Sequence, residues 1–70
     1  MNSNVRICVV GAGRWGTNHI KTLKNLGALG GIVESRENRR EELKTLFPEA
    51  TLFHSVRDVP LDDFDGFTVA

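Results

Sequence analysis

Short apolar runs alternate with amphipathic segments along the whole chain. The first run is β-branched and nearly continuous, and it consists of Val5, Ile7, Cys8, Val9 and Val10. Such a run predicts a strand buried on both faces, which is typical of a parallel sheet covered by helices. We therefore expect the next element to be a crossover helix that leads to a second, parallel strand.

The segment after residue 16 has the spacing of an amphipathic helix. Ile20, Leu23 and Leu26 recur every three residues, and polar residues fill most positions between them. Gly27 then stands where the end of a helix favours a residue with positive φ. The pattern predicts a helix that packs one apolar face on the sheet and ends at Gly27.

The second half of the chain repeats this alternation. Residues 29–33 predict a strand that two glycines weaken, and Asn38 with Glu41 resembles the capping pair at the start of a helix. On this helix we expect one apolar stripe of Leu43, Leu46 and Phe47, and we expect Pro48 to end the helix. The elements expected after it are a strand at 51–53, one helical turn at 55–59 and a strand at 66–70.

The expected order is β-α-β-α-β-β, with one helical turn before the last strand. Strands that alternate with helices predict an α/β fold with a mostly parallel sheet. We interpret the 70 residues as the first half of a doubly wound domain, truncated in its fourth strand. A chain of this length buries only about 60% of its extended surface, so we expect marginal stability.

Composition and charge exclude several classes of partner. Nine basic and nine acidic residues give no net charge, so the basic footprint expected of nucleic-acid or anionic membrane binding is missing. The charge is segregated, because residues 1–33 carry no acid, and any anion site is expected there. No apolar run approaches the roughly 18 residues of a membrane span. We interpret the chain as cytoplasmic, with no nucleic-acid or membrane partner.

Cysteine and histidine do not form a recognisable catalytic or metal centre. Cys8 is the one cysteine, which excludes an internal disulfide, and its apolar neighbours predict a buried side chain. His19 and His54 have no nearby partners arranged as a triad or a metal site, so we interpret both as packing or surface residues. We expect no catalytic residue and no metal ligand within the chain.

A glycine-rich turn, G-A-G-R-W-G, joins the first strand to the first helix. Gly11 permits the tight turn, Gly13 lets the backbone approach a pyrophosphate, and Gly16 allows the helix to pack closely on the strand. The helix N-terminus offers unpaired N–H groups to phosphates. Glu34, 18 residues beyond Gly16, ends the second strand, where an acid accepts hydrogen bonds from the adenosine ribose. The pattern predicts a Rossmann-type dinucleotide site.

Residues beside the glycines and Glu34 extend the predicted site. Arg14 adds a charge at the rim, Trp15 either packs on neighbouring loops or flanks the cofactor, and Arg36 is placed to stack on adenine. Glu34 repels a 2′-phosphate that Arg36 is able to pair with, and we expect the acid to prevail, so that NAD is preferred over NADP. Residues 36–44 are otherwise interpreted as a mostly solvated helix face. The predicted cofactor-binding residues are Gly11, Gly13, Arg14, Trp15, Gly16, Glu34 and Arg36.

Other interpretations of the glycine turn are less favoured. The turn could be structural alone, with Glu34 as a solvated residue. A P-loop is disfavoured because Thr17 stands where its lysine belongs. Methyltransferase sites share the turn and the acid, but the strict spacing of three glycines favours a dinucleotide.

Longer stretches resemble the glucose-fructose oxidoreductase, inositol dehydrogenase and rhizopine-catabolism family (Gfo/Idh/MocA). The likeness lies in V-V-G-A-G-R-W-G-T-N-H at 9–19, I-V-E-S at 32–35, L-F-P-E-A at 46–50 and D-G-F-T-V-A at 65–70. The resemblance implies hydride transfer between a nicotinamide cofactor and a sugar or nucleotide-sugar carbon. It also implies a homo-oligomeric full-length enzyme whose catalytic lysine, in an E-K-P motif, and substrate domain are absent from this segment.

These observations lead to one main interpretation and two alternatives. Residues 1–70 are interpreted as a partial NAD(P)-binding Rossmann domain of a sugar dehydrogenase that binds its substrate through another region. The first alternative is a non-catalytic dinucleotide-binding module or sensor. The second is an FAD-binding segment, because FAD sites use the same glycines and a similar acid.

Overall fold

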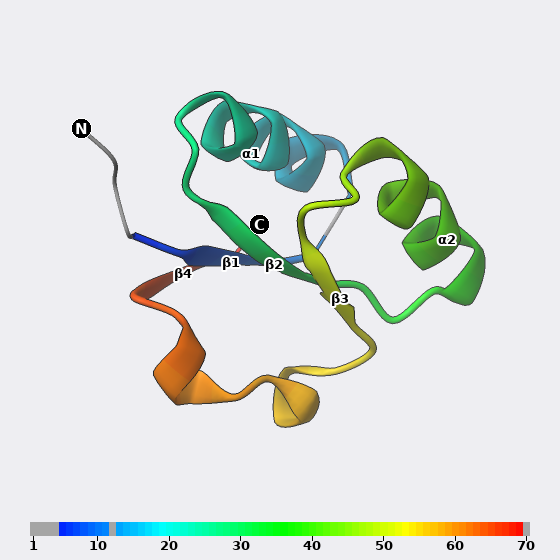
Figure 1. Cartoon of the computed structure of the whole chain (residues 1–70). Coiled ribbons are helices and arrows are strands. Elements are labelled where there is room, and N and C mark those ends of the chain that lie inside the picture. The colour runs from blue at the N-terminus through cyan, green and yellow to red at the C-terminus, as the bar shows by residue number, and fades with distance from the viewer. Residues whose placement is uncertain (1–4, 12, 70) are drawn as a thin grey trace.

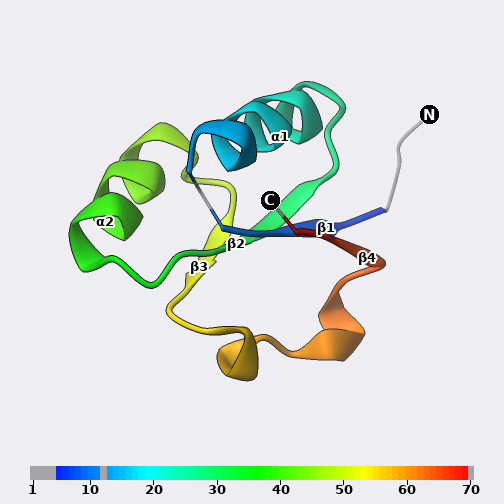
Figure 2. The same cartoon turned by 180° about the vertical axis from the view of Figure 1, so that it is seen from behind.

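One all-parallel sheet of four strands organises the chain. The computed structural model describes residues 5–11 and 13–69, and only the backbone at residues 14 and 15. Two helices cover one face of the sheet and two 3₁₀ turns lie on the other, as Figure 1 and Figure 2 show. This is the α/β arrangement that the alternating pattern predicted. In chain order the elements are β1 (Ile7–Val10), α1 (Arg14–Asn25), β2 (Leu29–Val33), α2 (Glu37–Leu46), β3 (Thr51–Phe53), the turns Val56–Asp58 and Leu61–Asp63, and β4 (Gly66–Val69).

The strand order is β3-β2-β1-β4, so the direction in which strands are added reverses at β1. After β3 the chain returns along the face opposite the helices and reaches the far side of β1 (Figure 1). Asp65 fixes this return at the amino ends of the strands: its carboxylate accepts from the Arg6 N–H at 2.8 Å, and its own N–H donates to the Arg6 carbonyl at 2.8 Å. All four carboxyl ends therefore lie at the same edge of the sheet.

The sheet separates two apolar clusters, as expected for strands buried on both faces. Alternation along β1 directs Val9 into the helix-side cluster and Cys8 into the cluster on the other face, and both are fully buried. Burial raises the pKa of the Cys8 thiol, which is therefore a small hydrophobic residue of the core. The helix-side cluster contains Val9, Ile20, Leu29, Ile32, Leu43, Phe47 and Ala50.

The end of α1 differs from the predicted apolar stripe. Gly27 has φ +73°, which confirms the positive φ expected after the helix. Leu26 is the C-cap residue and its side chain is 68% exposed, so the stripe ends at Leu23. Leu26 follows the last residue of α1 and does not belong to the apolar cluster that Ile20 and Leu23 contact.

Two predictions about α2 were wrong. Arg36, in extended conformation, is the N-cap and gives no side-chain cap, while Asn38 lies inside the first turn and accepts from the Arg39 N–H. The pair Asn38 and Glu41 therefore does not cap the helix. Leu43 and Phe47 are buried but Leu46, the last residue of α2, is 56% exposed, so only two of the three residues of the predicted apolar stripe reach the core.

The two glycines within β2 make room for aromatic rings. An added Cβ at Gly31 would meet Phe64 Cζ at 2.8 Å and Phe53 Cε2 at 3.1 Å. We expect Gly31→Ala to destabilise the fold by about 1–3 kcal/mol, because these packed rings cannot move aside. Urea denaturation measures the loss. The double substitution with Phe64→Leu should cost less than the sum of the single substitutions, and simple additivity would contradict the proposed clash.

Candidate functional site

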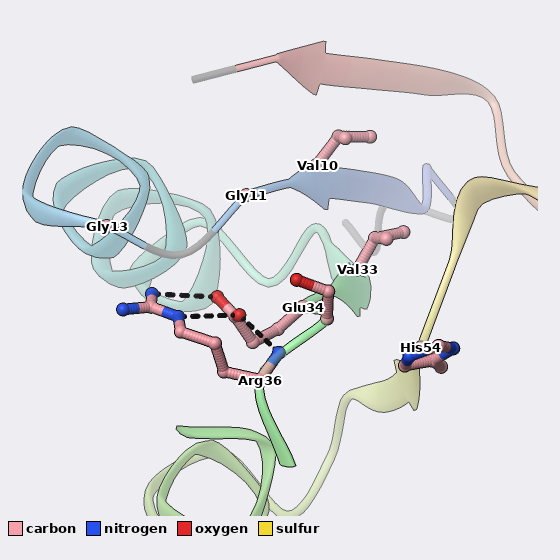
Figure 3. A pocket seen from close by; sticks show the side chains of 8 residues that line it. Val10, Gly11, Gly13, Val33, Glu34, Arg36 and His54 are labelled. Atoms are coloured by element: carbon pink, nitrogen blue, oxygen red, sulfur yellow. Dashed lines mark hydrogen bonds and ion pairs between the residues drawn. The ribbon is translucent and has the colours of Figure 1, made fainter. Parts of the chain in front are cut away.

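A cavity of about 360 Å³ opens at the carboxyl ends of β1, β2 and β3 (Figure 3). Parallel strands end at one edge, so residues distant in sequence meet there. The volume lies within the range of small-molecule sites. The cavity is lined by Val10, Gly11, Gly13, Val33, Glu34, Ser35, Arg36 and His54.

The glycine turn forms the α1 side of this cavity. Gly11 has φ +96°, and its N–H donates to the Val33 carbonyl at 2.9 Å, which ties the turn to β2. Gly13 is the N-cap of α1 in extended conformation, and an added Cβ there would meet no atom within 4 Å in the part of the chain that the structure describes. Gly16 is buried in the first turn of the helix. No acidic residue lies in that turn, so no carboxylate of α1 itself neutralises the partial positive charge of the helix N-terminus.

Glu34 is a buried carboxylate at the end of β2, with 5% of its surface exposed. Its N–H donates to the Phe53 carbonyl at 2.9 Å, which extends the pairing of β2 with β3. Its Oε2 accepts from the Arg36 N–H at 2.7 Å and from Arg36 Nε at 2.9 Å, and its Oε1 accepts from Arg36 Nη2 at 3.1 Å (Figure 3). These bonds raise the pKa of the Arg36 guanidinium. The interpretation of Glu34 as a solvated residue is therefore wrong.

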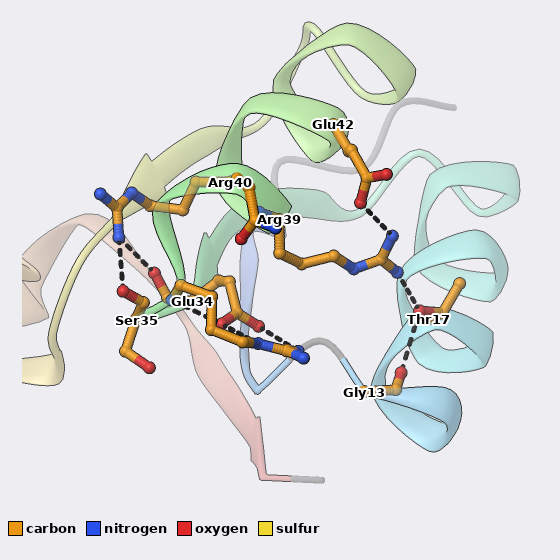
Figure 4. Close-up of polar contacts among 9 residues, drawn as sticks. Gly13, Thr17, Glu34, Ser35, Arg39, Arg40 and Glu42 are labelled. Atoms are coloured by element: carbon orange, nitrogen blue, oxygen red, sulfur yellow. Dashed lines mark hydrogen bonds and ion pairs between the residues drawn. The ribbon is translucent and has the colours of Figure 1, made fainter.

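Two further arginines from the first turn of α2 reach the site (Figure 4). Arg40 Nη1 donates to the carbonyls of Glu34 at 2.9 Å and Ser35 at 3.0 Å, which holds the end of β2. Arg39 Nη2 donates to Thr17 Oγ1 on α1 at 2.8 Å. These contacts were not predicted from the sequence, because an arginine-rich helix segment is usually solvated. The density of arginines at 36–40 is the one available signal.

Four of the seven predicted cofactor-binding residues line one cavity: Gly11, Gly13, Glu34 and Arg36. Gly16 is buried and is not among the lining residues. The side chains of Arg14 and Trp15 lie outside the described part of the structure. His54 also borders the cavity, which its position just after a strand could have indicated, whereas His19 is exposed on α1 and is not among the lining residues.

Neither a metal centre nor a membrane span is found in the described part of the chain. No three His, Cys, Asp or Glu side chains gather there to hold a metal ion. Neither described helix has the length and apolar character needed to cross a bilayer. No family model, curated protein or solved structure matches the chain significantly. A proposal of function therefore rests on the cavity, on its residues and on the sequence resemblance already described.

Proposed function

We propose that the chain binds the adenosine diphosphate half of NAD, as the cofactor-binding part of an oxidoreductase. One observation carries the proposal: the glycine turn and the buried Glu34 border the same cavity at the carboxyl ends of the strands. The strand order β3-β2-β1-β4 supports it, because the first four strands of a Rossmann domain have this order.

The glycine turn suits a diphosphate. At Gly13 an added Cβ would meet none of the described residues within 4 Å, and the absence of a side chain suits a close approach of a phosphate oxygen to the backbone. The first N–H groups of α1 have no partners within the helix and point out of its N-terminus. The turn thus supplies hydrogen-bond donors and a partial positive charge without a bulky side chain.

The end of β2 suits the adenosine ribose. A carboxylate oxygen accepts up to about two hydrogen bonds, and Arg36 already gives Glu34 Oε2 two of them. The ribose hydroxyls therefore compete with the Arg36 guanidinium for Glu34. The Arg36 side chain is 60% exposed and is able to move off the carboxylate, onto the adenine ring or into solvent.

The proposed reaction is hydride transfer between nicotinamide and the carbon of a sugar or nucleotide sugar. The nicotinamide ring, when bound, accepts or donates the hydride, and this chain orients the other half of the cofactor. The substrate class is supported by the resemblance of residues 9–19, 32–35, 46–50 and 65–70 to the Gfo/Idh/MocA family. We propose that the catalytic lysine and the substrate-binding residues of the enzyme lie outside this segment.

Glu34→Ala tests the role of the acid. Calorimetric titration should show that the unmodified protein binds NAD about tenfold or more tightly than NADP, equal to ~1.4 kcal/mol or more. The substitution should remove this preference, because it deletes the acceptor for the ribose hydroxyls and releases Arg36 to pair with a 2′-phosphate.

Glu49→Ala is the matched control, because Glu49 is exposed just before β3, at the amino end of a strand whose carboxyl end borders the cavity. It should leave both affinities unchanged. Equal binding of NAD and NADP by the unmodified protein, or an unchanged ratio in Glu34→Ala, would show that Glu34 does not select the cofactor. Failure of the unmodified protein to bind either dinucleotide would refute the proposed function.

A further inference from the structure

We infer that Arg39 is a positioning residue for diphosphate binding, acting through Thr17 on the glycine turn; this inference rests on the proposed function. Arg39 belongs to α2, whereas Gly13 and Thr17 belong to the start of α1. Arg39 is 25% exposed, so its side chain is packed between the two helices rather than solvated. From α2, the Arg39 side chain extends to Thr17, next to the glycine turn at which the diphosphate is proposed to bind (Figure 4).

Arg39, Thr17 and Gly13 form a chain of two hydrogen bonds, the relay, in which each donor and acceptor is defined. The Thr17 hydroxyl donates its one proton to the Gly13 carbonyl at 2.9 Å, and the same oxygen accepts from Arg39 Nη2 at 2.8 Å. The Thr17 N–H also donates to the Gly13 carbonyl, at 2.8 Å. The guanidinium cannot accept a proton, so it keeps the hydroxyl proton directed at Gly13. Successive hydrogen bonds of this kind polarise and strengthen one another, and the bond between Arg39 and Thr17 is partly buried.

The relay acts on the peptide that faces the phosphate. The peptide unit after Gly13 is planar and trans, so a fixed carbonyl also fixes the following N–H, which points the opposite way. That N–H belongs to the first turn of α1 and projects from the helix N-terminus, where anions bind. Arg39 therefore orients a phosphate donor without contacting the ligand itself.

The same turn of α2 holds the ribose side independently. Arg40 binds the carbonyls of Glu34 and Ser35, and Arg36 binds the Glu34 carboxylate. Loss of Arg39 should therefore weaken the binding of a ligand that carries phosphates and leave the binding of the nucleoside alone unchanged. A residue that merely joined the two helices would affect both kinds of ligand equally.

The experiment compares ADP with adenosine by ligand-observed NMR titration of the full chain. We expect Arg39→Met and Thr17→Val each to weaken the binding of ADP about fivefold to tenfold and the binding of adenosine less than about twofold. Thr17→Ser keeps the hydroxyl and should bind ADP within about twofold of the unmodified protein. The double variant Arg39→Met with Thr17→Val should be no weaker than the weaker single variant, because both interrupt one relay.

Two controls separate the relay from charge and from helix stability. Arg57→Met removes a cation on the exposed 3₁₀ turn across the sheet, and Glu42→Gln removes the negative charge of the carboxylate that Arg39 Nη1 contacts at 3.1 Å; both should leave ADP binding unchanged. Equal losses for ADP and adenosine, or a change below about twofold for ADP in both relay variants, would overturn the inference. If the unmodified protein binds no ADP, the proposed function itself is refuted.

Discussion

Gly13→Thr is expected to weaken NAD binding by about 30-fold or more, equal to ~2 kcal/mol, while the protein stays folded. Gly13 lines the cavity, and none of the described residues lies within 4 Å of an added Cβ, so added γ atoms occupy volume that the proposed diphosphate requires. Threonine and glycine are about equally good N-cap residues, and the extended backbone at Gly13, with φ −76°, accepts a β-branched side chain. Calorimetry measures the affinity, and circular dichroism with urea measures the stability.

Gly11→Ala supplies the contrast within the same turn. Gly11 has φ +96°, which strains a residue with a Cβ by roughly 1–3 kcal/mol, so this substitution should lower stability first. Substitution of Gly13 is thus expected to lower the affinity for NAD, whereas substitution of Gly11 is expected to lower the stability of the fold. Undiminished NAD binding by a folded Gly13→Thr variant would contradict the assignment of the turn to the diphosphate.

Leu43→Ala is expected to lower the free energy of unfolding by about 2–5 kcal/mol. Leu43 is fully buried in the helix-side cluster beneath α2, and truncation leaves a cavity among Ile32, Phe47 and its other neighbours. The whole chain, at 70 residues, should be stable by only roughly 3.5–10 kcal/mol. The substitution therefore removes a large share of the stability, and a substantial unfolded population is expected at 37 °C.

Leu46→Ala is the matched control on the same helix. Leu46 is 56% exposed, so the identical truncation should change stability by about 0.5 kcal/mol or less. Thermal and urea unfolding of both variants, followed by circular dichroism, measure the difference. Similar losses for the two leucines would mean that α2 does not pack on the sheet through Leu43.

The periodicity of the chain was enough to predict its elements and most of their order. Local pattern determines whether a segment is buried on both faces or along one stripe, and this is why β1, α1 and the strands after it were correctly expected. The errors fell at helix ends. Leu26, Leu46 and the Asn38–Glu41 pair were misassigned because a helix end and the width of a buried stripe depend on the surface beneath them.

The candidate site was likewise predicted from the sequence only in part. Glycine spacing and the distance to Glu34 are local properties, so the sequence by itself determined which residues form the turn and end β2, while their cofactor remains a prediction. Only the tertiary structure decided that Arg36 covers the Glu34 carboxylate and that Arg39 reaches Thr17. A long, flexible arginine side chain selects its partner from whatever groups packing brings within reach. For Arg39 that group is Thr17, which lies 22 residues earlier on another helix, and local sequence carries no information about the distance between them.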